Sequence, residues 1–256
     1  MEKPQRRTMG SGQDFWDQRY EDMKDETDGH FDWYAGFDKV RGVIEPYIDE
    51  ARKGDSILIL GCGSSRLGPE LYEAGYRSLL NVDISSVVIR QMQDRYAKYE
   101  GMHFNIQDVR CMDDLESESF TMVVDKGTMD ALFCATSGTE DVKKMCGEVS
   151  RVLAPGGRFV VITHGTEAMR KMHLTRPVFD WNVEHTIIAD ETQGSTHVFI
   201  MEKHDHSLVT YDVTAGAGGG GGGGGRGGGG GGQGPPGPPG LGAIDDRALG
   251  RSETKG

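Results

Sequence analysis

Short apolar runs alternate with longer amphipathic segments between residues 57 and 203, and this alternation limits the chain to few folds. Two segments have helical spacing: one spans 85–99 behind Ser85 as its N-cap, and the other spans 139–153 and stops at Pro155. The runs are flanked by turn residues and are typical of strands buried on both faces: 57–60, 79–82, 103–106, 120–124 and 158–162. Strands that alternate with helices predict a parallel sheet covered on both sides by helices.

The last two strand candidates break this alternation. Residues 181–188 and 196–201 are separated by only seven residues, which is too short for a crossover helix but enough for a hairpin. Upstream, residues 14–20 and 38–53 predict two further helices. We therefore expect an α/β fold, a Rossmann-like doubly wound seven-stranded sheet, mostly parallel with an antiparallel last strand.

Glycine divides the chain into a body and a tail. Of the 39 glycines, 18 lie in residues 1–215 and 21 in residues 216–256. The tail has two collagen-like triplets and a single Arg226 in its glycine run, too little for a triple helix or for RNA binding. We expect a flexible N-terminus over 1–13, one domain over 14–213 and a disordered Gly/Pro-rich tail over 214–256.

The charge of the chain restricts its partners. The net charge is −12, and residues 1–215 carry 24 basic against 37 acidic side chains. Non-specific attraction to nucleic acid needs clustered Lys and Arg, so a nucleic-acid partner is not expected. An acidic body suits a basic protein or a cationic ligand better.

Cysteine usage and the apolar runs indicate a location. The four cysteines contain no C-x-x-C pair, which argues against a disulfide framework and against a zinc site, and we expect reduced thiols. The first twenty residues contain acidic side chains and no apolar run, so we expect no secretory signal. No apolar stretch approaches the roughly 20 residues that span a bilayer, so no membrane partner is expected. We expect a monomer in the cytoplasm, with the nucleus left open.

A glycine turn follows the first strand candidate. Gly61 and Gly63 flank Cys62 between this strand and a helix, so the backbone can approach a nucleotide-like ligand closely. A dinucleotide fingerprint would have a third glycine where this chain has Arg66, which argues against a pyrophosphate ligand. A tight turn without a ligand is the alternative.

Three aspartates lie at the ends of successive strand candidates. Asp83 could accept the two hydroxyls of a ribose, Asp108 beside Val109 could accept from an adenine amino group, and Asp125 ends the fourth strand. Single acids at such positions often cap helices, but three line the crevice where open α/β sheets bind ligands. They favour an adenosine ligand without pyrophosphate, and S-adenosylmethionine, with its cationic sulfonium, suits an acidic pocket.

The motifs across residues 14–203 resemble the seven-strand S-adenosylmethionine-dependent methyltransferases. The matching segments are 58–63, 81–83, 107–109 and 153–159. Three more segments, 125–131 with 15–20 and 31–34 upstream, are similar to the protein-lysine methyltransferases that modify translation elongation factor 1-alpha, a branch related to a citrate-synthase-modifying enzyme. The Gly-rich tail has no counterpart in that pattern.

This resemblance implies a set of cofactor contacts. It implies that Gly61 touches the methionine end of S-adenosylmethionine, and that Lys126 adds a contact after the fourth strand. It further implies that three aromatic residues close over the cofactor: Trp16, Tyr20 and Trp33. It implies that Asp83 with Ile84 binds the ribose and that Asp108 with Val109 binds the adenine. The alternatives are that the aromatic residues are core anchors and that Lys126 balances charge.

The expected reaction is methyl transfer to a neutral lysine amine of a protein such as elongation factor 1-alpha. Asp125 and Asp130 are our candidate catalytic residues, which would orient the ammonium and help it lose a proton. We expect no metal ligands, no histidine base and no nucleophilic role for Cys62. A small-molecule methyltransferase and a non-catalytic binding protein of the same fold are the alternatives. A nucleobase methyltransferase is disfavoured because its Pro-Pro-aromatic signature is absent after the fourth strand.

Overall fold

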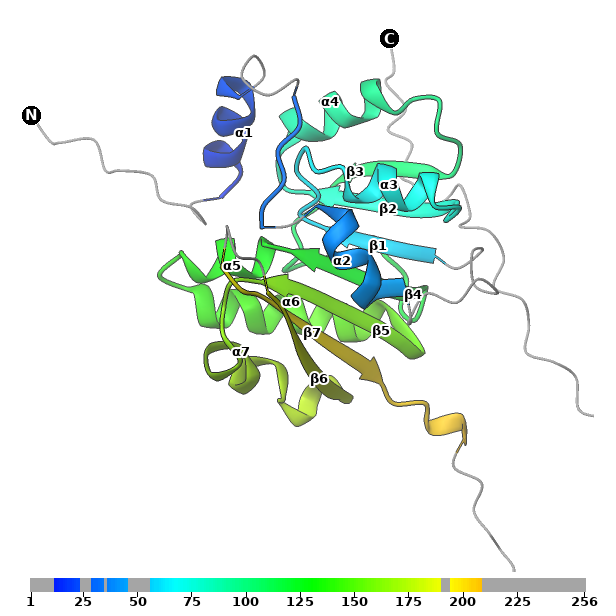
Figure 1. Ribbon diagram of the computed structural model, residues 1–256, viewed down its shortest axis with the longest axis vertical. Coiled ribbons are helices and arrows are strands. Elements are labelled where there is room, and N and C mark those ends of the chain that lie inside the picture. The colour runs from blue at the N-terminus through cyan, green and yellow to red at the C-terminus, as the bar shows by residue number, and fades with distance from the viewer. Residues whose placement is uncertain (1–11, 24–28, 35, 46–55, 190–193, 209–256) are drawn as a thin grey trace, which may run out of the picture.

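A seven-stranded sheet forms the centre of the molecule (Figure 1). The computed structural model describes residues 12–23, 29–34, 36–45, 56–189 and 194–208. The strands follow the order β3-β2-β1-β4-β5-β7-β6 across the sheet. Their bounds are β1 Ser56–Leu60, β2 Ser78–Asp83, β3 Met102–Ile106, β4 Phe120–Lys126, β5 Leu153–Thr163, β6 Trp181–Ile188 and β7 Thr196–Lys203.

Strand direction confirms the predicted fold class. Strands β1 to β5 pair only in parallel with one another, whereas β7 pairs antiparallel with both β5 and β6. The hairpin of β6 and β7 is therefore formed as predicted, and β7 is inserted between β5 and β6. Because the strand order reverses between β1 and β4, the fold is doubly wound.

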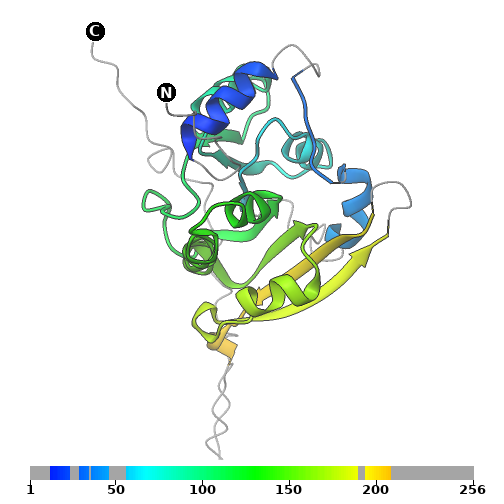
Figure 2. The ribbon, with the colours of Figure 1, turned by 90° about the vertical axis from the view of Figure 1, so that its left-hand side faces the viewer.

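Helices cover both faces of the sheet, and Figure 2 shows the sheet between α2 on one side and α6 on the other. Successive strand residues point to opposite faces, so Ile57 and Ile59 join one core while Leu58 and Leu60 join the other. The first core packs against α1 Gln13–Asp22, α2 Phe37–Ile44, α3 Leu67–Glu73 and α4 Ser86–Arg95. The second packs against α5 Thr128–Phe133, α6 Gly138–Val152 and α7 Glu167–Leu174.

The largest differences from the predicted boundaries are at α4, β5 and α2. Ser85 is the N-cap of α4 and accepts from the amide of Val88, but the helix ends at Arg95 rather than 99. Strand β5 begins at Leu153, directly after α6, and so includes the Pro-Gly-Gly segment expected as a turn. Helix α2 spans 37–44, and the part of its predicted range from 46 to 53 lies outside the described residues.

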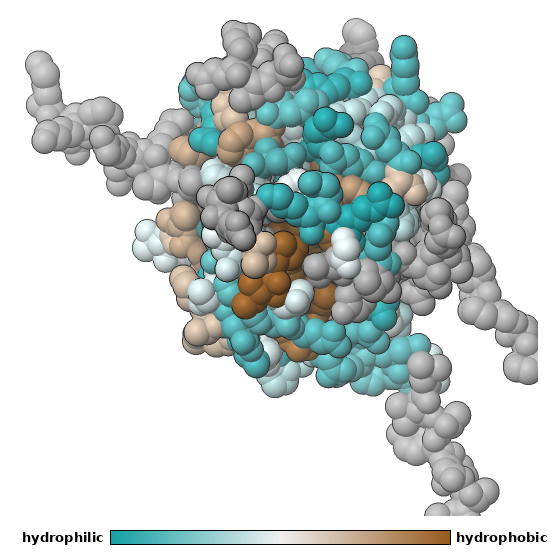
Figure 3. Space-filling model, viewed as in Figure 1, coloured by the Kyte–Doolittle hydropathy of each residue, from teal (hydrophilic) through white to brown (hydrophobic). Residues whose placement is uncertain are grey.

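The N-terminal residues 1–11 and the Gly-rich tail also lie outside the described residues, so their expected flexibility stays a prediction. Hydrophilic residues cover most of the face seen in Figure 3, and hydrophobic residues gather in one patch near its centre. Among the described residues, no helix combines the length and the apolar character needed to cross a membrane.

Candidate functional site

A cavity of about 1190 Å³, measured with its open mouth, lies where β1, β2 and β4 end. This edge contains the reversal of strand order, between β1 and β4, where open α/β sheets bind ligands. The candidate catalytic residue Asp130 lines the cavity. So do all nine residues expected to contact a cofactor: Trp16, Tyr20, Trp33, Gly61, Asp83, Ile84, Asp108, Val109 and Lys126. The parallel strands end at one edge, so residues far apart in sequence meet there.

Two glycines form the floor of the cavity because no larger residue fits. Gly61 and Gly63 both have φ +50, a left-handed backbone that favours glycine. A Cβ at position 61 would lie 2.1 Å from Oγ1 of Thr128, and one at position 63 would lie 2.6 Å from Oη of Tyr20. The turn after β1 therefore brings its bare backbone against the cavity, as the sequence predicted.

Asp83 joins this turn to the end of β2. Its Oδ2 accepts from the amide of Gly63 at 2.9 Å, and its Oδ1 accepts from the amide of Ser85 at 2.9 Å. Burial raises the pKa of Asp83 to about 6, against the opposing effect of these amide hydrogen bonds. The carboxylate lines the cavity and can accept further hydrogen bonds there.

Asp108 is held by an arginine that the sequence analysis did not single out. Arg110 donates to Asp108 through Nε at 2.9 Å and Nη2 at 2.6 Å, and its Nη1 lies 3.3 Å from Asp141. Burial raises the pKa of Asp108, but the hydrogen bonds from Arg110 outweigh it and hold the pKa below the usual value. Arg110 also lines the cavity, so this end of the site contains a fixed ion pair.

Aromatic side chains form the opposite wall. Trp16 and Tyr20 of α1 stack with ring centroids 6.1 Å apart, and Phe31 and Trp33 meet edge to face at 4.9 Å. The guanidinium of Arg19 lies 5.4 Å from the ring centroid of Trp33. Tyr20 also belongs to the buried core, so the core-anchor alternative and the cavity-wall expectation both hold for it.

Asp32 ties the segment 29–34 to the sheet. It pairs with the ammonium of Lys126 at the end of β4 and accepts from Oγ of Ser65 and, at 3.3 Å, from the amide of Arg66. Burial raises the pKa of Asp32, but Lys126 and the hydrogen bonds hold it below its usual value. Lys126 thus does balance a charge, and in doing so it holds the aromatic wall in place.

A second cluster surrounds Asp130. Its Oδ2 accepts from Oη of Tyr34 at 2.5 Å and from the amide of His164 at 3.2 Å. Its Oδ1 accepts from Oγ1 of Thr163 and from Nη2 of the buried Arg170, both at 2.5 Å. These four donors fill the acceptor positions of the carboxylate.

Tyr34 is the member of this cluster that combines a strained backbone with a place on the cavity wall. Its φ is 68, which is uncommon for a tyrosine, and its ring lies 3.9 Å from the ring of His164, centroid to centroid. Burial and the hydrogen bond to Asp130 raise the pKa of Tyr34, so it stays a neutral phenol. With its proton donated to Asp130, its oxygen keeps lone pairs for a ligand.

The position of Asp125 does not fit the catalytic role expected for it. Its side chain is fully buried and is absent from the cavity wall, and its two oxygens accept from the amides of Thr128 and Met129 at 2.8 Å and 3.0 Å. Burial raises the pKa of Asp125 to about 7. The carboxylate caps the start of α5, so of the two candidates only Asp130 reaches the cavity.

Cys62 and three histidines have different surroundings. Burial raises the pKa of Cys62 well above its usual value, which leaves an unreactive thiol. His164 reaches the site through its stacking on Tyr34, whereas His173 contacts Phe133 and His185 contacts His197 on β7.

These residues fit S-adenosylmethionine. The turn at Gly61 and Gly63 presents bare backbone to the cavity, buried Asp83 offers acceptors for a ribose, and aromatic faces suit an adenine and a sulfonium. The third glycine of a pyrophosphate site is replaced by Arg66. The sheet order, the place of the cavity and its donor set define an S-adenosylmethionine-dependent methyltransferase.

Comparisons with known proteins agree with this class of protein. Residues 51–212 match the family model described as a methyltransferase domain, and the chain belongs to this family. It is 36% identical over 197 residues to the mouse EEF1A lysine methyltransferase 4, covering 74% of each chain. It is 34% identical to the zebrafish eEF1A lysine and N-terminal methyltransferase, covering 75% of this chain and 27% of that one.

Solved structures share the fold at low identity. The magnesium protoporphyrin IX methyltransferase from Synechocystis, solved with bound S-adenosylmethionine, has a TM-score of 0.55 and 15% identity, covering 75% of this chain and 94% of that one. The cyclase SpnF has a TM-score of 0.56 and 11% identity, covering 77% and 96%. Proteins with this fold therefore catalyse different reactions, and the acceptor must be inferred from the site and the sequence relatives.

Proposed function

We propose that this protein transfers methyl groups from S-adenosylmethionine to a lysine side chain of translation elongation factor 1A. The observation that carries the proposal is the 36% identity over 197 residues to the mouse EEF1A lysine methyltransferase 4. Support comes from the acidic body, with 24 basic against 37 acidic side chains in residues 1–215, which suits a basic protein substrate. We place the reaction in the cytoplasm, with the protein acting as a monomer.

We assign the residues of the cavity wall to the parts of the cofactor that they would hold. Asp83 with Ile84 would hold the ribose, Asp108 with Val109 would hold the adenine, and the bare turn at Gly61 would receive the methionine end. The aromatic wall covers the cofactor, and Lys126 keeps that wall in place through Asp32. Arg110 orients Asp108, so the adenine amino group meets a carboxylate whose position is fixed.

Tyr34 receives the acceptor amine. Because Asp130 already accepts from four donors, a substrate ammonium finds no vacant acceptor position on it. Tyr34 lines the same cavity, and its phenolic proton points to Asp130, so a lone pair of its oxygen can accept an N–H of the substrate. Asp130 and Arg170 are then positioning residues that hold Tyr34.

When bound, S-adenosylmethionine supplies an electrophilic methyl group on a sulfonium. The substrate lysine, whose ammonium has a pKa of about 10.4 in water, must first release a proton to solvent. Its neutral nitrogen would then take the methyl group as the C–S bond breaks, with adenosylhomocysteine as the leaving group. The contribution of the protein is to orient the amine and to exclude water, which can supply much of the rate in a bimolecular reaction.

Methyl transfer tests the proposed function directly. Purified elongation factor 1A is incubated with tritiated S-adenosylmethionine and the full chain, and labelled lysine is located by mass spectrometry. We expect label on lysine with the wild type and none with Asp83→Ala. Label confined to small molecules, or no labelled protein when whole-cell lysate is the substrate, would reject the protein-lysine assignment.

Gly61→Ala should impair both the turn and the site. The new Cβ would overlap Oγ1 of Thr128, and the left-handed backbone alone costs about 1–2 kcal/mol for a residue other than glycine. We expect a lower Tm from this strain. We also expect at least about tenfold weaker cofactor binding by calorimetry, or about 1.4 kcal/mol, because the overlap displaces the turn that lines the cavity. Gly147→Ala on α6 is the control, because its Cβ meets nothing within 4 Å. Equal effects of the two substitutions would contradict the role of the turn.

Cofactor affinity should fall in mild acid. The ionised form of Asp83 accepts the ribose hydroxyls, and its pKa is about 6. Cofactor affinity is therefore highest well above pH 6 and falls as the pH drops through 6. If only the ionised form binds, affinity at pH 5 falls about tenfold from its value at pH 7.5. Asp108 does not contribute over this range, because Arg110 holds its pKa low. Calorimetry checks this, and Asp83→Asn should bind weakly without this pH dependence. A flat profile for the wild type would exclude Asp83 as the titrating group.

A further inference from the structure

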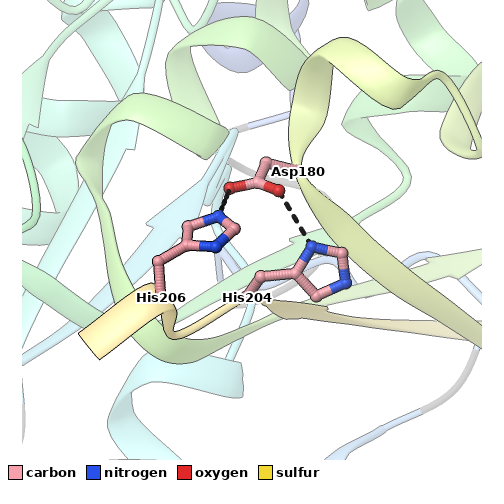
Figure 4. A group of neighbouring side chains, drawn as sticks. All are labelled: Asp180, His204 and His206. Atoms are coloured by element: carbon pink, nitrogen blue, oxygen red, sulfur yellow. Dashed lines mark hydrogen bonds and ion pairs between the residues drawn. The ribbon is translucent and has the colours of Figure 1, made fainter. Parts of the chain in front are cut away.

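A carboxylate and two imidazoles meet where β6 begins and β7 ends. Nδ1 of His204 lies 2.9 Å from Oδ1 of Asp180, and Nε2 of His206 lies 2.6 Å from Oδ2. Figure 4 shows both rings turned toward the carboxylate of Asp180. One donor atom from each of the three residues lies within 4.8 Å of the others. This is the one group in the described part of the chain found with that metal-ligand arrangement.

The backbone around this cluster is held in place. Trp181 and Lys203 form the end pair of the β6–β7 ladder. Asp180 directly precedes this pair on one strand, and His204 directly follows it on the other. The amide of His204 donates to the carbonyl of Asp180 at 3.0 Å. The ring of Trp181 is buried and donates to the carbonyl of Leu174 at 2.7 Å. The ligand atoms thus start from a rigid ladder rather than from two independent loops.

We propose that Asp180, His204 and His206 bind a divalent transition metal ion, with Zn²⁺ the best match. Zinc bonds to imidazole nitrogen and carboxylate oxygen are about 2.0–2.2 Å long, so neighbouring ligand atoms of a tetrahedral site lie about 3.3 Å apart. In the structure the facing nitrogen and oxygen atoms lie 2.9 Å and 2.6 Å apart, so a bound ion would move these side chains to that spacing. Two nitrogen donors disfavour Mg²⁺ and Ca²⁺, which prefer oxygen.

The open side of the cluster supplies the fourth ligand position. The side chains of Asp180 and His204 are 42% and 41% exposed, and that of His206 is 71% exposed, so a water molecule can complete the tetrahedron. In the structure the carboxylate of Asp180 pairs with the two imidazoles. A bound cation would instead neutralise Asp180 and fix the end of β7 to the start of β6.

This site is separate from the methyl-transfer cavity. Strands β5 and β6 are both antiparallel to β7 and so run in the same direction, which places the start of β6 at the opposite end of the sheet from the cavity. A metal there would have a structural role. Loss of the site should therefore leave methyl transfer unchanged.

Zinc titration of the chelator-treated full chain tests the proposal. Cys111 and Cys134 are exposed thiols and are first replaced by serine, so that thiolates do not compete. We expect calorimetry to show one Zn²⁺ bound and a higher Tm with zinc, and no binding of Mg²⁺. His206→Ala, in an exposed turn, should weaken zinc binding at least about tenfold, since even outer-shell changes at metal sites cost about 10–100-fold.

Two further variants decide the outcome. Asp180→Asn should also weaken zinc binding, and it tolerates the φ of 55 found at this position. His103→Ala on β3 is the control and should bind zinc as the parent chain does. The proposal is overturned if the parent chain binds no zinc, or if His206→Ala and Asp180→Asn, shown by their metal-free Tm to be folded, bind it as tightly as the parent.

Discussion

Asp83→Ala should lower the affinity for S-adenosylmethionine by about 100-fold or more. The substitution removes the buried carboxylate that we assign to the ribose. Hydrogen bonds to a charged group contribute about 1.5–3 kcal/mol each, so the loss of two amounts to about 3–6 kcal/mol. Since 1.4 kcal/mol is a factor of ten, the expected loss is about 100- to 10,000-fold. Calorimetry with the cofactor measures it.

The same substitution also removes two internal hydrogen bonds, to the amides of Gly63 and Ser85. Circular dichroism and thermal unfolding must therefore show that the variant is folded, and Asp83→Asn, which keeps the shape, serves as a second variant. Asp94→Ala, an exposed acid on α4, is the matched control and should bind like the wild type. Wild-type affinity in a folded Asp83→Ala protein would reject the ribose assignment.

Tyr34→Phe should lower kcat by about 100-fold while leaving cofactor affinity within about twofold. The variant keeps the ring against His164 and loses only the hydroxyl that we assign to the acceptor amine. Tyr34 acts by orienting the amine, and a misplacement of reacting groups by about 1 Å can cost about 100-fold in rate. Single-turnover methyl transfer with saturating cofactor measures the chemical step, and calorimetry measures cofactor binding.

Tyr99→Phe is the matched control for this prediction. The hydroxyl of Tyr99 also donates to a carboxylate, that of Glu73 at 3.0 Å, but on the surface and away from the cavity. We expect this variant to keep wild-type kcat. A purely structural role for Tyr34 would lower cofactor affinity and kcat together, and wild-type kcat in Tyr34→Phe would remove the residue from the reaction.

Asp130→Asn tests whether Asp130 acts by holding Tyr34 in position. The substitution removes the negative charge that pairs with buried Arg170, and breaking a buried ion pair costs about 3–5 kcal/mol of folding free energy when one charge is left unpaired. We expect a lower Tm together with a lower kcat. A variant with wild-type Tm and wild-type kcat would show that the cluster does not hold Tyr34.

The strand-end acids show where sequence reasoning reached its limit. Asp83 ends β2, Asp108 lies two residues after β3 and Asp125 is the last residue but one of β4, and these positions alone do not tell which carboxylates face the cavity. In the structure Asp83 and Asp108 line the cavity, whereas Asp125 turns beneath the first amides of α5. The helix that follows β4 at once, from Thr128, provides free N–H groups that capture the nearest carboxylate.

Apart from Arg110, which lies two residues after its partner Asp108, the residues missed by the sequence analysis are partners across long separations. Asp32 and Lys126 are 94 residues apart, Tyr34 and Asp130 are 96 apart, and Arg170 lies 40 residues after Asp130. No local spacing or periodicity links such pairs. The Asp180, His204 and His206 cluster escaped notice for the same reason, because its members are brought together by the β6–β7 pairing.

The alternation of apolar runs and amphipathic segments determined the sheet, its two helical layers and the edge at which a ligand binds. Those properties follow from residue periodicity and from the shared direction of parallel strands, so they can be derived from local sequence. Only the tertiary structure decided which carboxylates face the cavity, which are occupied by an arginine or a helix terminus, and which tyrosine is free to meet the substrate. Such choices depend on side chains that compete for the same hydrogen-bond donors, and that competition arises only once the chain has folded.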